Sequence, residues 1–220
     1  MLRKFLPGVL VAFLLLPAAA EDAEFKPIFN GKDLSGWSGD TELWRVEDGE
    51  IVGTTHPKKI VQNTFLSYDT PYADFVLRVK VKLTNHNSGI QFRSERLPDH
   101  VMAGYQADVA EKTYFGMLYE EKKRGILPYW TALPEAEQAA INGAAKQGDW
   151  NQYEITCQGH HVKMVLNGKT TLDFDDPEGA LEGHIGLQLH AGSSMEVRFK
   201  DIEVKDLKAA KAEKSSRKER

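Results

Sequence analysis

The sequence predicts an all-β protein built as a sandwich of antiparallel sheets. Apolar and polar residues alternate with a period of two in several short runs, most clearly over 74–83 and 184–190. The Asn167-Gly168 pair follows another such run and is the strongest short-range signal for a β-hairpin. No alternation of strands with helices is present, so a parallel α/β fold is not indicated.

The other candidate strands are short and regularly spaced, as in sandwich proteins. They are 44–46, 50–52, 64–68, 88–93, 105–109, 114–119, 160–166, 170–174 and 195–204. One segment departs from this pattern. Pro134 at a first helical position, acidic residues behind it and then alanines predict a short helix near 134–146. That helix lies in an insertion over 121–149, and so long an insertion is typically functional or mobile.

Composition excludes several classes of protein. The chain has 220 residues, 41% hydrophobic and 27% charged, with a net charge of −4, which is ordinary globular composition. Nothing in this balance favours a nucleic-acid partner, which requires a basic face. The basic segment 208–220 lacks apolar periodicity, so we expect a disordered, solvated tail; an electrostatic tether to anionic surfaces is the alternative.

The N-terminus has the pattern of a targeting sequence. Arg3 and Lys4 precede a short apolar run, and residues 18–20 are three alanines, which predicts a signal peptide over 1–20 cleaved after Ala20. An uncleaved anchor is the alternative. After cleavage we expect no membrane span, a domain over 21–207, and an exported protein, either periplasmic or secreted. Cys157 is the only cysteine and alternates with apolar residues, so we expect a buried core thiol.

Polar residues occupy three strand faces in an unusual way. Each of three predicted strands places an amide side chain two residues from a second polar group on its outward face. The pairs are Gln91 and Arg93, Gln106 and Asp108, and Gln188 and His190. If these strands are neighbours, the pairs form one patch suited to a hydroxyl-rich ligand. The alternative is the ordinary polar outer face of an antiparallel sheet.

Known catalytic motifs are absent, but one spacing is informative. The segment 106–111 has the Glu-x-Asp-x-x-Glu spacing of laminarinase-type sandwich glycosidases, with Gln106 at the position of the nucleophile. A neutral amide cannot form a glycosyl-enzyme, so ordinary retaining hydrolysis is not expected here. Glu120 and Glu121 follow a predicted strand and either enter a cleft or are solvated.

A series of motifs in a fixed order resembles the 3-keto-disaccharide hydrolase domain family. The matching segments are 29–37 (FNGKDLSGW), 44–52 (WRVEDGEIV), 87–93 (NSGIQFR), 104–108 (GYQAD), 148–151 (GDWN), 166–168 (LNG), 183–190 (GHIGLQLH) and 199–202 (FKDI). The resemblance implies a concanavalin A-like jelly-roll sandwich. It also implies an exported enzyme that cleaves 3-keto-glycosides by C2 proton abstraction, elimination and hydration.

This implied chemistry needs a base, a stabiliser of the enolate and an acid, but no carboxylate nucleophile. We hypothesise that Asp108 or His190 is the base, that Arg93 stabilises the enolate and that Glu120 is the acid. The residues expected to hold an oligosaccharide or glycoside ligand are Gln106, Gln188, Asn87, Tyr119, Gln91 and Trp150. No cofactor is required; a divalent metal ion near Asp108 and His190 is left open. The alternative function is a non-catalytic, lectin-like carbohydrate-binding module.

Overall fold

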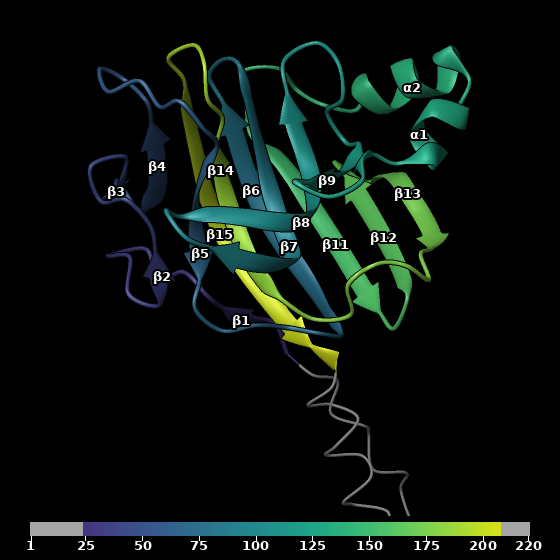
Figure 1. Cartoon of the computed structure of the whole chain (residues 1–220), viewed down its shortest axis with the longest axis horizontal. Coiled ribbons are helices and arrows are strands. Elements are labelled where there is room, and N and C mark those ends of the chain that lie inside the picture. The colour runs from purple at the N-terminus through teal and green to yellow at the C-terminus, as the bar shows by residue number, and fades with distance from the viewer. Residues whose placement is uncertain (1–23, 208–220) are drawn as a thin grey trace, which may run out of the picture.

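The computed structural model describes residues 24–207, which form two antiparallel β-sheets packed face to face with two short helices at one end (Figure 1). The predicted signal peptide over 1–20 and the predicted tail over 208–220 lie outside the described residues. The elements in chain order are β1 (Lys26–Pro27), β2 (Trp37–Ser38), β3 (Trp44–Glu47), β4 (Glu50–Thr54), β5 (Thr64–Tyr68), β6 (Phe75–Leu83), β7 (Asn87–Leu97), β8 (Val101–Ala110), β9 (Leu118–Glu121), β10 (Gly125–Ile126), α1 (Pro128–Ala132), α2 (Glu135–Asn142), β11 (Asn151–Gln158), β12 (His161–Leu166), β13 (Lys169–Asp175), β14 (His184–Leu189) and β15 (Glu196–Asp206).

The sheets are assembled from strands far apart in the chain. Sheet A has the order β13-β12-β11-β6-β15-β4-β3, with β1 also paired to β15. Sheet B has the order β10-β9-β8-β7-β14-β5-β2. In each sheet a C-terminal strand pairs with an N-terminal one: β15 with β4 in sheet A, and β14 with β5 in sheet B. The fold is therefore a jelly-roll sandwich. The predicted all-β fold class is confirmed.

Alternation builds the core in the way the sequence predicts. In β6 every second residue from Phe75 to Leu83 is buried, and the residues between them are partly exposed. The β12–β13 hairpin turns at Asn167 and Gly168, which both have positive φ (51° and 84°), as its tight turn requires. Cys157 is completely buried in the core and free, which confirms its predicted position.

The helical insertion differs from its prediction in extent. The predicted helix near 134–146 is α2, which begins at Glu135 and ends at Asn142. The chain turns tightly after it, since the N–H of Ala144 donates to the carbonyl of Ile141. The preceding helix α1 was not predicted. Its five residues begin at Pro128 and present the buried Trp130, a pattern too short to show helical periodicity.

No helix among residues 24–207 is long and apolar enough to cross a lipid bilayer.

Candidate functional site

A pocket of about 220 Å³ opens on the face of sheet B that points away from sheet A. Its lining comes from β7, β8, β9, β10, the segment after β14 and the loops before β5 and β9. The lining residues are Asn63, Asn87, Gln106, Asp108, Tyr114, Met117, Tyr119, Glu121, Ile126 and His190. The structure therefore brings five predicted site residues together: Asn87, Gln106, Asp108, Tyr119 and His190. Their neighbours in the strands, such as Tyr105 and Ala107, point into the core.

Asp108 is the most perturbed acid of the pocket. Its side chain is almost completely buried, and one carboxylate oxygen accepts a hydrogen bond of 2.8 Å from the amide of Gln106. Burial raises the pKa of Asp108 to about 7; the Gln106 hydrogen bond opposes this shift, and the nearby charge of Glu121 adds to it. A carboxyl group with this pKa both accepts and donates a proton near neutral pH.

A chain of hydrogen bonds orients the Gln106 amide. The Ser94 hydroxyl donates to the Gln91 oxygen at 2.5 Å, and the Gln91 nitrogen donates to the Gln106 oxygen at 2.8 Å. The Gln106 nitrogen is then left to face Asp108. Gln91 is fully buried beneath the pocket and is absent from its lining, so the structure gives it the place of a positioning residue rather than a ligand contact.

Gly89 makes room for this arrangement. It lies opposite Asp108 in the β7–β8 pairing. A Cβ atom at this position would come within 2.3 Å of the Gln106 Cδ. The Gln106 side chain therefore lies over β7 at Gly89, where no side chain blocks it.

Glu121 is the second acid of the pocket, whereas the role of acid is predicted from the sequence for its neighbour Glu120. The Glu121 carboxylate accepts hydrogen bonds from Asn63 at 3.2 Å and from Gln188 at 3.4 Å. Gln188 is fully buried, and its side-chain oxygen has no hydrogen-bond partner. The signal for Glu121 was present in the alternation: if Tyr119 faces outward, then Glu121 shares its face.

Glu120 is not in the pocket. It lies opposite Tyr105, on the side of β9 that faces the core. There it forms an ion pair with Arg124, which also binds Asp176 at 2.5 Å. The Tyr105 hydroxyl donates to the same Asp176 carboxylate. The acid role predicted for Glu120 is therefore incompatible with its position, because this ion-pair network occupies its carboxylate.

Arg93 is also placed away from the pocket, and its predicted outward orientation is wrong. The β7–β8 and β7–β14 pairings both change register near this residue, which has φ of 48°. Such a bulge reverses which face the following side chains occupy. The guanidinium is buried and donates to the carbonyls of Ala73 and Gly159 at 2.7 Å, with Asp74 at 3.3 Å. These contacts tie sheet B to loops of sheet A, so Arg93 cannot reach an enolate in the pocket.

Trp150 lies on the other sheet. It immediately precedes β11, and the ammonium groups of Lys200 and Lys82 lie 3.8 Å and 5.1 Å from its ring centroid. Lys82 alternates with core residues of β6, so this is the outer face of sheet A. Trp150 therefore does not contribute to the pocket, and cation–π contacts account for its place.

His190 follows β14 and lies at the pocket wall. Its Nδ1 is 2.7 Å from the carbonyl oxygen of Ala191, and the His86 Nε2 is 3.1 Å from the same oxygen. A carbonyl oxygen only accepts hydrogen bonds, so His190 carries its proton on Nδ1 when neutral. The other ring nitrogen, Nε2, is then an acceptor. The imidazole rings of His86 and His190 meet edge to face, with their centroids 5.0 Å apart.

The pocket has two acids but lacks a recognisable metal-ligand cluster. Within residues 24–207, no three or more His, Cys, Asp or Glu side chains converge in a way that could hold a metal ion.

Comparison of the fold with solved structures identifies other jelly-roll proteins. A Parabacteroides distasonis protein, described as a putative glycosyl hydrolase, is 23% identical, with a TM-score of 0.63 over 88% of this chain and 98% of that one. The carbohydrate-binding module CBM66 from Bacillus subtilis is 16% identical, with a TM-score of 0.55 over 78% and 96% of the two chains. At these identities the likeness establishes the fold alone.

Comparison with curated protein sequences finds no match. The family comparison is decisive, since the model described as the 3-keto-alpha-glucoside-1,2-lyase-like domain matches residues 24–205, almost all of the described chain. The protein therefore belongs to the 3-keto-alpha-glucoside-1,2-lyase-like domain family.

Proposed function

We propose that this protein is an exported enzyme that cleaves the glycosidic bond of 3-keto-glycosides. The observation that carries the proposal is the buried Asp108 carboxyl, whose pKa of about 7 suits proton transfer at neutral pH. Family membership supports the same substrate class. Export rests on the N-terminal targeting pattern of the sequence.

The reaction begins with removal of the proton on C2, which the adjacent C3 ketone acidifies. Asp108 in its carboxylate form takes this proton, and the electron pair of the C–H bond forms the enolate. When the enolate collapses, the ketone re-forms, the bond from C1 to the leaving oxygen breaks, and a C1–C2 double bond remains. Water then adds its hydroxyl to C1 and a proton to C2, which yields the free 3-keto sugar.

The other roles fall to residues in the pocket. Glu121 or His190 protonates the leaving oxygen, and His190 is the alternative base because its Nε2 accepts a proton. With Arg93 excluded by its position, we assign stabilisation of the enolate oxygen to the Tyr119 hydroxyl and the Asn87 amide, two neutral donors of the lining. Gln188 holds Glu121 in place from beneath.

Incubation in D₂O tests this mechanism. The protein is given a 3-keto-disaccharide or its unoxidised parent, with and without a chelator. Selective cleavage of the keto sugar with deuterium at C2 supports elimination and hydration, and inhibition by the chelator would add a metal ion. The matched control is Asp201→Asn, which removes a carboxylate on the outer face of sheet A, paired there with Lys80. Its turnover should equal that of the native chain.

A carbohydrate-binding module is the second candidate function. The unpaired side-chain oxygen of Asn87, which lines the pocket, favours it, because this oxygen can accept a hydrogen bond from a sugar hydroxyl without any chemistry. Binding of both sugars without cleavage would select this alternative.

A further inference from the structure

The pocket has an apolar side as well as a polar one. The rings of Tyr114 and Tyr119 and the side chains of Met117 and Ile126 form the apolar side, and the amides and acids form the polar one. Among residues 24–207, four large hydrophobic side chains are exposed: Val61, Tyr114, Ile126 and Leu181. Two of these, Tyr114 and Ile126, line this one pocket. Exposed apolar side chains concentrated around a polar cavity indicate a ligand with an apolar part.

The helical insertion supports the apolar side from behind. Trp130 of α1 packs with Met117 and with Ile141 of α2 in a small hydrophobic cluster separate from the main core. The Tyr114 ring lies against Trp130, with ring centroids 6.3 Å apart. Both helices lie at the end of the sandwich near β9, the strand that carries Tyr119 (Figure 1). The insertion thus packs directly behind the apolar side.

Depth separates the two sides of the pocket. Asp108 and Glu121 are 5% and 8% exposed, whereas Tyr114 and Ile126 are both 41% exposed. The cavity of about 220 Å³ is smaller than the roughly 300–1,000 Å³ of pockets that enclose drug-sized ligands. It therefore has room for one sugar ring, and the rest of a glycoside must lie at the mouth.

We infer that the mouth formed by Tyr114 and Ile126 is a subsite for an aromatic aglycone. This inference rests on the proposed function, in which the keto sugar occupies the deep end beside Asp108. The leaving group then extends outward onto the exposed Tyr114 ring and the Ile126 side chain. A planar apolar group buries both surfaces, whereas a second sugar, whose hydroxyls stay hydrated at this exposed mouth, removes less apolar surface from water.

Two substrates with leaving groups of similar acidity test the subsite. Benzyl and methyl 3-ketoglucoside both release simple alcohols, so a difference in kcat/KM reports contact with the aglycone rather than its chemistry. We expect kcat/KM to be about tenfold higher for the benzyl glycoside, in the range that apolar contacts provide. Equal values for the two substrates would overturn the subsite while leaving the proposed function intact.

Variants locate the contact. Tyr114 has φ of 72°, so Tyr114→Asn removes the ring and keeps a residue that tolerates this backbone. Ile126→Ser removes the second apolar surface. Both should abolish the preference, so that within each variant kcat/KM is the same for the benzyl and the methyl glycoside. The matched control is Leu181→Ser, an exposed apolar residue absent from the lining of this pocket, and it should keep the preference.

Binding measurements test the subsite even if the proposed enzymatic function is wrong. If neither glycoside is cleaved, calorimetry with the same two compounds still reports on the mouth. Tighter binding of the benzyl compound that Tyr114→Asn removes would support the subsite without the enzyme. Equal binding of the two compounds would overturn it.

Discussion

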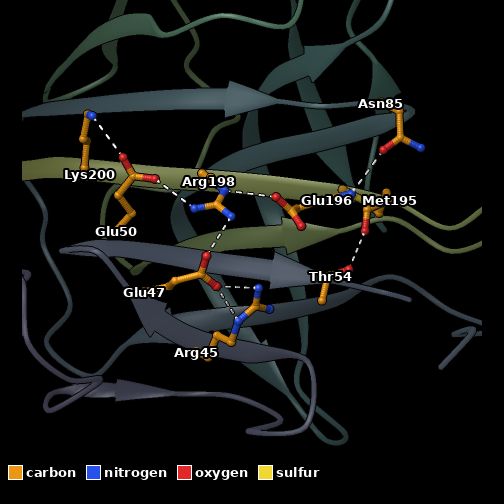
Figure 2. A network of polar contacts seen from close by, with 9 residues as sticks. All are labelled: Arg45, Glu47, Glu50, Thr54, Asn85, Met195, Glu196, Arg198 and Lys200. Carbon is orange, nitrogen blue, oxygen red and sulfur yellow. Dashed lines mark hydrogen bonds and ion pairs between the residues drawn. The ribbon is translucent and has the colours of Figure 1, made fainter. Parts of the chain in front are cut away.

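The outer face of sheet A and the pocket on sheet B both carry acidic residues. On sheet A these acids form ion pairs with basic residues, whereas in the pocket they contact amides. On sheet A, the Arg198 guanidinium donates to Glu196 at 3.0 Å, to Glu47 at 3.2 Å and to Glu50 at 3.3 Å (Figure 2). Lys200 donates to Glu50 at 3.1 Å. The hydrogen bond with Glu196 is the main cause that raises the pKa of Arg198, so this network keeps one charge state.

The pocket holds acids without cations. Its lining contains neither Lys nor Arg, and the contacts of Asp108 and Glu121 are amides. Burial without a compensating charge is what raises the pKa of Asp108 to about 7. The comparison teaches that paired charges stabilise a sheet face, whereas a buried, unpaired acid is free to exchange a proton.

The largest expected effect comes from removing this unpaired acid. Asp108→Asn keeps the shape and the hydrogen bond from Gln106 but cannot take a proton. We expect turnover of a 3-keto-disaccharide to fall about 10²–10⁴-fold, the usual contribution of a general base. Product analysis measures turnover, and circular dichroism checks the fold. Turnover within a few-fold of the native value would remove Asp108 from the mechanism.

The pH dependence of activity and stability sharpens the comparison. A base must be deprotonated, so kcat/KM should rise with pH through a midpoint near 7, the pKa of Asp108. Stability should change in the opposite sense. Between pH of about 4 and 7, Asp108 is protonated in the folded state but ionised in the unfolded state. The free energy of unfolding therefore falls as pH rises through this range, by about 4 kcal/mol at most.

Denaturant unfolding of the native protein and of Asp108→Asn at pH 5 and pH 8 measures this linkage. The native protein should lose stability relative to the variant as pH rises. Parallel behaviour of the two proteins would mean that the pKa of Asp108 is close to its ordinary value in the folded state.

A smaller effect is expected from Gly89→Ala. The new methyl group would displace the Gln106 side chain, whose Cδ lies 2.3 Å from the added Cβ position. Asp108 then loses the hydrogen bond that lowers its pKa, so the midpoint of the pH profile should move upward. Well below this midpoint, near pH 5, kcat/KM should fall about tenfold for a rise of about one pKa unit (1.4 kcal/mol), and at pH 7 about fivefold.

A double variant shows whether Gly89 acts through Gln106. In the background of Gln106→Ala, the Gly89→Ala change should have almost no further effect on kcat/KM. Additive losses would mean that Gly89 acts by another route.

The smallest effect is expected on the outer face of sheet A. Arg198→Met should lower the free energy of unfolding by about 1 kcal/mol or less, because its partners are solvent-accessible. The loss should shrink at about 1 M salt, where screening acts over ~3 Å. Turnover should not change. A loss of activity in this variant would contradict the assignment of a purely structural role to this face.

The sequence determined the fold class and part of the site. Alternation over 75–83 defines a strand face by itself, since a period of two needs no partner. The Asn167-Gly168 turn is equally local. Gln106 and Asp108 were found because they are two residues apart in an unbroken strand, which places both on one face.

Only the tertiary structure decided which polar residues meet. Arg93 lies in the same kind of alternating run, but a bulge at that position turns its side chain inward to carbonyls of residues 73 and 159. Glu120 and Glu121 are adjacent in a strand and so lie on opposite faces, and the pairing of β9 with β8 decides that Glu121 takes the face of the pocket. Trp150 lies at the start of a strand of the other sheet. Register, bulges and strand order depend on contacts between segments far apart in the chain, and a local pattern does not contain them.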